Sequence, residues 1–220
     1  MAHSPRNGKH VDESVKREQF DTAYRTESSG WVIGGPQPTI VDLERAGFVR
    51  GRVLDAGCGT GEHTIHLTRL GYDVLGVDFS EVAVDLARRN AERHGVPARF
   101  QVADMLEPTH TEHFDTVVDS ALFHVFAPDD AARYARALHR VCRPGAWVHV
   151  LALALTDEPG FGPRISDTAI REAFTEGWRL DGLDRSRYRA VARGEPAERL
   201  GVDSGDTVDL PAWLARLRRQ

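Results

Sequence analysis

A glycine-rich turn constrains this chain more than any other segment. The sequence Val53-Leu-Asp-Ala-Gly-Cys-Gly-Thr-Gly-Glu62 begins with a short apolar run, which predicts a strand ending at Asp55. Three glycines at alternate positions then let the backbone turn tightly beside a ligand and enter a helix. Helix N-termini normally attract phosphate, but the third glycine comes one residue too early for G-x-G-x-x-G, and Asp55 would repel a pyrophosphate. The turn therefore favours a ligand with a cationic end, such as an ammonium group, for Asp55 to bind.

Strands and helices alternate from Arg52 onward, which is typical of βαβ units with a parallel sheet. We expect an α/β fold: a Rossmann-like sheet of seven mostly parallel strands, helices on both faces and an antiparallel last strand. After the strand at Val53-Leu54, further strands are expected at Asp73–Val77, Arg99–Val102, Phe114–Val118, Ala146–Leu153 and Trp178–Leu183. The segment Trp213–Arg219 fits a helical turn or an antiparallel edge strand, and we favour the strand. Helices are expected from the glycine turn to Gly71, from Ser80 to Gly95, over Asp129–Val141 and over Asp167–Phe174.

Composition narrows the class of protein. The 220 residues, 41% of them hydrophobic, suit a single domain. A net charge of -5 gives no sign of a nucleic-acid partner. The N-terminus lacks a signal-peptide pattern and no apolar run reaches the roughly 18 residues of a membrane span, so we expect a cytoplasmic protein without a membrane partner. Two cysteines, Cys58 and Cys142, fit a reducing compartment, and the ten histidines form no tight ligand pattern, so no metal is expected.

Two further acidic residues indicate which ligand the turn binds. Asp78 ends the second strand, 21 residues after Gly57, where a carboxylate can bind both hydroxyls of a ribose. After the third strand, Asp104 lies where an adenine amino group would lie, and the apolar Ala103 and Met105 flank it. An ammonium group, a ribose and an adenine without phosphates describe S-adenosylmethionine.

These features in this order resemble class I S-adenosylmethionine-dependent methyltransferases over about residues 45–185, including the turn at Arg143-Pro-Gly145. The segment Trp31-Val-Ile-Gly-Gly-Pro-Gln-Pro38 resembles one in the thiopurine, thiol and halide methyltransferases and related bacterial heterocycle-modifying enzymes, where it folds over the methionine part of the cofactor. Segments 119–126 and 159–166 also resemble that group.

This resemblance implies one methyltransferase domain over 1–220. Residues 1–45 would form an N-terminal helical lid, and residues 46–220 a core whose loop 156–166 lies over the active site. The cofactor, leaving as S-adenosylhomocysteine, would contact Trp31, Asp55, Gly57, Cys58, Gly59, Thr60, Gly61, Asp78, Phe79, Ala103, Asp104, Met105 and Asp119.

The methyl acceptor is expected near the end of the fourth strand, because this edge faces the ligand crevice in open parallel sheets. His124 titrates near neutrality, so we expect it to act as the base or to orient the acceptor. Its alternative is a structural role at the strand–helix connection. Tyr24, Phe123, Phe126 and Arg164 are the other expected substrate contacts; the alternatives are core packing for the aromatic residues and a surface position for Arg164.

The predicted reaction is in-line transfer of a methyl group to S, O or N of a small aromatic or heterocyclic molecule. The sulfonium is already a good leaving group, so a base is needed only for a weakly acidic acceptor. A monomer is the default expectation, and a dimer stays open. The alternatives are a thiol or halide methyltransferase, an RNA or protein methyltransferase, a nicotinamide-dependent oxidoreductase and a non-catalytic cofactor-binding protein.

Overall fold

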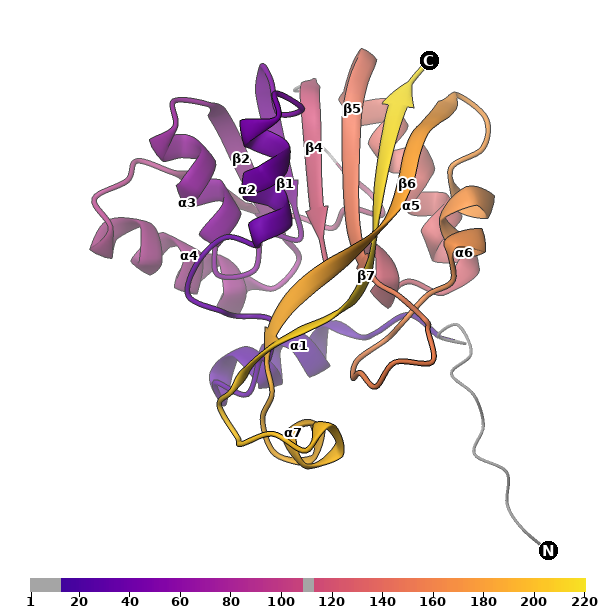
Figure 1. Ribbon diagram of the computed structural model, residues 1–220. Coiled ribbons are helices and arrows are strands. Elements are labelled where there is room, and N and C mark those ends of the chain that lie inside the picture. The colour runs from indigo at the N-terminus through magenta and orange to yellow at the C-terminus, as the bar shows by residue number, and fades with distance from the viewer. Residues whose placement is uncertain (1–12, 109–112) are drawn as a thin grey trace, which may run out of the picture.

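A computed structural model describes residues 13–108 and 113–220 (Figure 1). Seven strands form one sheet in the order β3-β2-β1-β4-β5-β7-β6. All neighbouring pairs are parallel except β5–β7 and β7–β6, so only β7 runs against the others. This confirms the expected Rossmann-like architecture. The expectation that the last strand lies at the edge is wrong, because β7 pairs with both β5 and β6 and the edge strand is β6. The strands are β1 Arg52–Ala56, β2 Asp73–Asp78, β3 Arg99–Val102, β4 Phe114–Ser120, β5 Cys142–Leu153, β6 Trp178–Val191 and β7 Thr207–Arg219.

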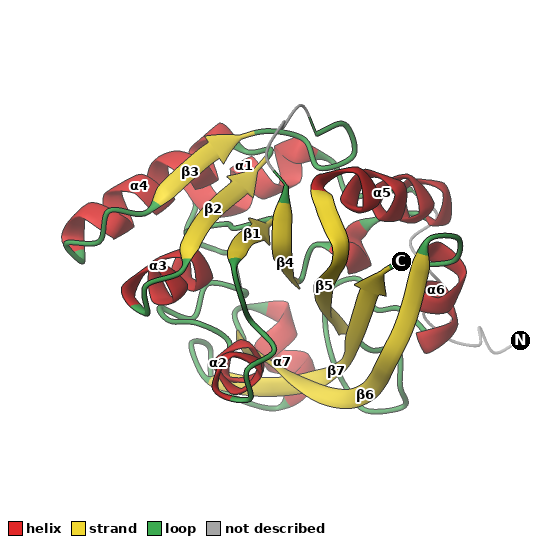
Figure 2. Ribbon diagram, turned by 90° about the horizontal axis from the view of Figure 1, so that it is seen from above, coloured by secondary structure: helices red, strands yellow, loops and turns green. Residues whose placement is uncertain are grey.

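Helices cover both faces of the sheet (Figure 2). On one face α2 (Pro38–Arg45) and α3 (Glu62–Arg69) bury Ile40, Leu43 and Leu67 against the sheet. On the other face α5 (Pro128–Val141) and α6 (Asp167–Ala173) bury Tyr134, Leu138 and Ile170. The remaining helical segments are α1 Arg17–Arg25, α4 Glu81–Arg93, the 3-10 turn η1 Phe123–Val125 and α7 Glu195–Leu200. Within the described residues no helix is long and apolar enough to cross a membrane.

Ser80 begins α4 as predicted, because its hydroxyl oxygen accepts a hydrogen bond from the Ala83 N–H at 3.1 Å. The same hydroxyl donates to a carboxylate oxygen of Asp21 on α1. Helix α1 thereby lies across the carboxyl ends of the strands (Figure 1). The expected N-terminal lid thus contains a helix, but residues 38–45, expected within the lid, form α2 and belong to the core.

The last two strands are longer than predicted. β6 continues from the expected end at Leu183 to Val191, and β7 begins at Thr207 instead of Trp213. The hairpin of β6 and β7 extends beyond the other strands of the sheet. In the outer part of β6 polar residues obscure the strand pattern, because only Tyr188 and Ala190 are buried there. Strand β5 begins at Cys142, so the expected turn at 143–145 is an irregular start of the strand, with a register shift against β4.

Candidate active site

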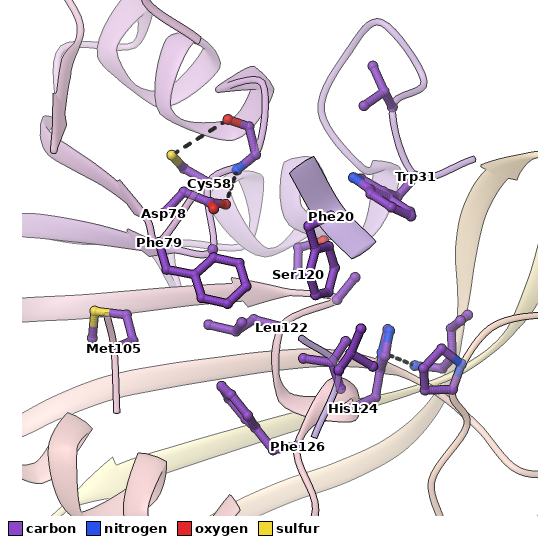
Figure 3. A pocket seen from close by; sticks show the side chains of 18 of the residues that line it. Phe20, Trp31, Cys58, Asp78, Phe79, Met105, Ser120, Leu122, His124 and Phe126 are labelled. Atoms are coloured by element: carbon purple, nitrogen blue, oxygen red, sulfur yellow. Dashed lines mark hydrogen bonds between the residues drawn. The ribbon is translucent and has the colours of Figure 1, made fainter. Parts of the chain in front are cut away.

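A cavity of about 1380 Å³, including its opening to solvent, lies at the carboxyl ends of β1 to β4. Its walls come from the turn after β1, the ends of β2, β3 and β4, α1 and the β6–β7 hairpin, and Figure 3 shows side chains from several of these segments around one space.

The glycine-rich turn forms one end of this cavity. Gly57 and Gly59 have φ angles of 72° and 53°, which favour glycine. A Cβ at Gly59 would lie 3.0 Å from the Tyr24 hydroxyl oxygen, so a side chain would press on α1. Gly61 does not line the cavity; a Cβ there would lie 2.8 Å from the Phe100 ring. The turn residues on the cavity wall are Gly57, Cys58, Gly59 and Thr60.

Asp55 is not on the cavity wall, contrary to its expected contact with an ammonium group. Its carboxylate is buried and accepts hydrogen bonds from the Thr64 N–H at 3.0 Å and the Thr64 hydroxyl at 2.6 Å. Helix α3 follows Gly61, which has no side chain to cap it, so Asp55 supplies the cap from β1. Burial raises the pKa of Asp55 to about 6, although both hydrogen bonds oppose the shift.

Asp78 does face the cavity, at the end of β2 (Figure 3). One carboxylate oxygen accepts the Gly59 N–H at 3.0 Å, and the other accepts the Ser80 N–H at 2.9 Å. Each oxygen keeps a further lone pair that a hydroxyl group can use. Burial raises the pKa of this carboxyl to about 6, and the two backbone hydrogen bonds oppose that rise.

Asp119 is fully buried behind the cavity wall and does not line it. Its carboxylate accepts hydrogen bonds from the N–H groups of Leu122 and Phe123 and, at 2.8 Å, from the Tyr134 hydroxyl. Burial raises its pKa to about 7. Asp119 therefore positions the segment that leads into η1, instead of touching a ligand as expected.

The residues that we expect to contact the adenine lie close together at the ends of β2 and β3. Phe79, Ala103, Asp104 and Met105 all line the cavity. Met105 is buried and Asp104 is exposed, with one oxygen accepting the Leu106 N–H at 2.8 Å. These residues form an apolar slot with one carboxylate at its edge, which suits a flat base carrying an amino group.

Three aromatic residues of the lid cover the cavity: Phe20, Tyr24 and Trp31. The Phe20 ring lies 5.7 Å from Trp31 and 5.5 Å from Phe79, both edge to face. The Trp31 N–H donates to the Tyr24 hydroxyl at 3.1 Å. The predicted Trp31 and Tyr24 therefore lie on the cavity wall, together with Phe20, which was not predicted as a contact.

The far side of the cavity is mostly apolar. His124 and Phe126 line it as predicted, and both are visible in Figure 3. The Leu153 N–H of β5 donates to Nδ1 of His124 at 3.0 Å, and burial lowers the pKa of this histidine to about 4. The expected covering loop 156–166 reaches this side of the cavity through Phe161 and Pro163, but none of the apolar side chains here other than Phe126 was predicted as a contact. The unpredicted side chains include Val32, Leu153, Phe161, Pro163, Tyr188, Ala190 and Leu210.

Two predicted substrate contacts lie elsewhere. Phe123 is a core residue, with its ring 5.5 Å from Phe174 and 6.4 Å from Tyr134. Arg164 is not on the cavity wall; its guanidinium donates to the Glu158 carbonyl at 3.1 Å, within the same loop. Both positions match the alternatives named above, core packing and an arginine outside the site.

The charges of the cavity wall are acidic. Asp78, Asp104 and Glu62 line it, and no lysine or arginine does among the described residues. A phosphate group would therefore meet repulsion without a compensating cation, whereas a cationic ligand is favoured.

Glu62 and His63 also line the cavity, although neither was predicted as a contact. They directly follow the glycine turn, and this position in the sequence was the signal that could have identified them. No group of three or more His, Cys, Asp or Glu side chains in residues 13–108 and 113–220 is placed to bind a metal ion.

Comparisons with known proteins agree with this geometry. Residues 53–145 match the model of a family described as a methyltransferase domain. The 2-heptyl-1-hydroxyquinolin-4(1H)-one methyltransferase of Mycobacteroides abscessus is 31% identical over 92% of this chain and 97% of that protein. Thiocyanate methyltransferase 1 of Brassica oleracea is 23% identical over 88% of this chain and 87% of its own.

Among solved structures, one concerns the conversion of a disulfide bond into a thioacetal group during echinomycin biosynthesis. It superposes with a TM-score of 0.81 at 41% identity, covering 93% of both chains. One of these relatives is named for a heterocycle and another for thiocyanate. This similarity confirms the resemblance of residues 31–38 to the thiol, halide and heterocycle methyltransferase group. This chain belongs to the S-adenosylmethionine-dependent methyltransferases.

Proposed function

We propose that this enzyme methylates S, O or N of a small aromatic or heterocyclic molecule that lies between the lid and the β6–β7 hairpin. The observation that carries the proposal is the single cavity that joins a cofactor half, around Asp78 and Met105, to an apolar half, around Phe126 and Leu210. In this arrangement the two ligands would meet in one cavity, where the bound molecules and the lid residues over them would limit the access of water.

The residues present fit S-adenosylmethionine. Gly57 and Gly59 bring the backbone of the turn onto the cavity wall, where a Cβ at Gly57 would press on Leu122 and one at Gly59 on Tyr24. We assign the ribose hydroxyls to the free lone pairs of Asp78 and the adenine to the slot between Phe79 and Met105. The methionine end would lie by the turn at 57–60. The bound cofactor supplies a methyl group on a sulfonium, which the Trp31 and Tyr24 rings favour as a cation.

The chain supplies orientation more than covalent chemistry. Phe20, Tyr24 and Trp31 cover the cofactor half, and Phe161 and Pro163 border the acceptor half, so both would exclude water. An acceptor that arrives as an anion or with a free sulfur lone pair needs no deprotonation. We propose that no metal takes part and that activity survives EDTA.

Similarity to two relatives narrows the acceptor. One relative is named for a hydroxyquinolinone, which supports a flat heterocyclic acceptor in the apolar half. The 41% identical structure concerns a disulfide that becomes a thioacetal, which favours sulfur in a larger natural product as a second candidate. A macromolecular acceptor fits poorly, because the site is a cavity roofed by α1 and carries no lysine or arginine among its described lining residues.

Calorimetric titration with S-adenosylmethionine and S-adenosylhomocysteine tests the first part of the proposal, and absence of binding would refute it. Mass spectrometry then follows methyl transfer to thiols, iodide, phenols, N-heterocycles, 2-heptyl-1-hydroxyquinolin-4(1H)-one and a cyclic disulfide peptide. Methylation of the quinolinone supports the leading acceptor class, and methylation of the peptide alone supports the second. Gel filtration tests the proposed monomer.

A further inference from the structure

The hydrogen bond at Nδ1 of His124 fixes which ring nitrogen carries the proton. The donor is the backbone N–H of Leu153, 3.0 Å away, and a backbone amide nitrogen can only donate. Nδ1 must therefore present its lone pair. A neutral imidazole has one protonated nitrogen, so the proton lies on Nε2.

The Nε2 side of the ring faces the cavity. His124 is a lining residue, and no described residue accepts a hydrogen bond from Nε2. Figure 3 shows His124 among the residues around the pocket, and because Leu153 occupies Nδ1, Nε2 is the ring nitrogen left for a ligand. A second proton would have to enter at Nδ1, against the Leu153 N–H, on a ring that is only 4% exposed. The ring therefore stays neutral and offers one donor.

We propose that the Nε2–H of His124 is a fixed hydrogen-bond donor that positions the methyl acceptor, and that His124 is not the general base. This inference builds on the proposed function and defines its substrate class. The acceptor carries an oxygen or nitrogen lone pair, such as a carbonyl, an amide carbonyl or an oxyanion, beside the atom that is methylated. Phe126, Leu153 and Pro163 make the surroundings apolar, which strengthens such a bond and penalises an acceptor that leaves the donor unpaired.

Two substitutions separate the two ring nitrogens. In His124→Asn the amide oxygen can take the place of Nδ1 and accept the Leu153 N–H, while nothing replaces Nε2. In His124→Gln the longer side chain brings an amide N–H to the Nε2 position. With S-adenosylmethionine and 2-heptyl-1-hydroxyquinolin-4(1H)-one as the probe, H124N should lower kcat/KM about tenfold to hundredfold, mainly through KM. H124Q should recover part of the loss.

Affinity for S-adenosylhomocysteine is the control for folding, and it should change less than about twofold in either variant. Wild-type kcat/KM should show no acid limb from a histidine above about pH 5. H124N with wild-type kcat/KM would overturn the inference, as would an acid limb near the ordinary histidine pKa that disappears in H124N.

A nitrogen NMR measurement tests the tautomer without any turnover. The imidazole signals present in the wild-type protein and missing in H124N belong to His124. They should show a protonated Nε2 and an unprotonated Nδ1 from about pH 5 to 8. A protonated Nδ1, or a titration in that range, would refute the inference. If the protein bound the cofactor but methylated no probe, the proposed function would fail, and the tautomer would still decide the state of His124.

Discussion

Three aspartates near strand ends have similar backbone hydrogen bonds but different positions relative to the cavity. Asp55, Asp78 and Asp119 each accept N–H groups from the helix or loop that follows or adjoins their strand, yet only Asp78 also lines the cavity. The sequence places all three at the right edge of the sheet, but not their side chains relative to the ligand. A carboxylate that satisfies backbone donors is as useful for building the site as one that touches the ligand.

Removing the Tyr134 hydroxyl should lower the stability of the fold, because the buried Asp119 carboxylate then lacks a hydrogen-bond donor. In Tyr134→Phe the carboxylate loses its 2.8 Å donor in a fully buried position, so the free energy of unfolding should fall by about 1–3 kcal/mol at neutral pH. Urea denaturation followed by circular dichroism measures the change. Tyr72→Phe is the matched control: its hydroxyl is only partly buried and should cost less. Equal losses in both variants would contradict this role of Asp119.

His149 should make the fold sensitive to acid. Its buried ring donates to the Phe48 carbonyl at 3.1 Å between the Phe48 and Trp147 rings, and burial lowers its pKa to about 4, with Arg216 and Arg50 adding to the shift. The unfolded chain takes up this proton below about pH 6.5 and the folded chain does not, so stability is lost as the pH falls toward 4.

The variant His149→Gln keeps a donor for Phe48 without a titrating group. Relative to the wild type, it should therefore gain up to about 3 kcal/mol between pH 7 and pH 4. Urea denaturation at several pH values measures this difference. A difference that does not change with pH would show that His149 titrates normally.

At the scale of elements, the lid helix is attached to the core through few groups. The Ser80 hydroxyl donates to Asp21 on α1 while accepting from Ala83 on α4, so this side chain adds a polar link between the lid and the cofactor half to the ring contact of Phe20 with Phe79. Asp21→Ala should therefore loosen α1 without unfolding the core. We expect faster hydrogen exchange in residues 17–25 and about threefold to tenfold weaker binding of S-adenosylhomocysteine, equivalent to about 1 kcal/mol.

The exposed Asp42 on α2 provides the control for this lid prediction. Asp42→Ala should leave both exchange and affinity unchanged. If Asp21→Ala behaved like Asp42→Ala, the link between α1 and α4 would have no effect on the site.

The elements differ in how well sequence predicts them. The parallel strands and the start of α4 have clear local signals, namely apolar runs, glycine stops and the Ser80 cap. The long hairpin does not, because the outer part of β6 buries only Tyr188 and Ala190 among charged neighbours. The cofactor half follows local motifs and was largely predictable. The acceptor half is built from side chains spread along the chain from Val32 to Leu210, so the fold is needed to show that they meet.

For the whole molecule, the stabilisation that a bound ligand gives to the fold should depend on pH through Asp78. A ligand at about 100 times its Kd stabilises a fold by about 2.7 kcal/mol, which corresponds to roughly 5–10 °C for a chain of this size. The assigned ribose hydroxyls donate to the ionised carboxylate, whereas the pKa of Asp78 in the free protein is raised to about 6 by burial. Below that pH the carboxyl must first lose its proton, so binding weakens as the pH falls.

The increase in Tm caused by S-adenosylhomocysteine should therefore be larger at about pH 7.5 than at about pH 5, measured by scanning calorimetry with and without ligand. Asp55 and Asp119 also titrate in this range, but they do not line the cavity and contribute alike with and without ligand, so the difference isolates Asp78. In Asp78→Asn the increase should be small and independent of pH. The same increase at both pH values in the wild type would place the ribose elsewhere, and with it the orientation of the cofactor in the cavity.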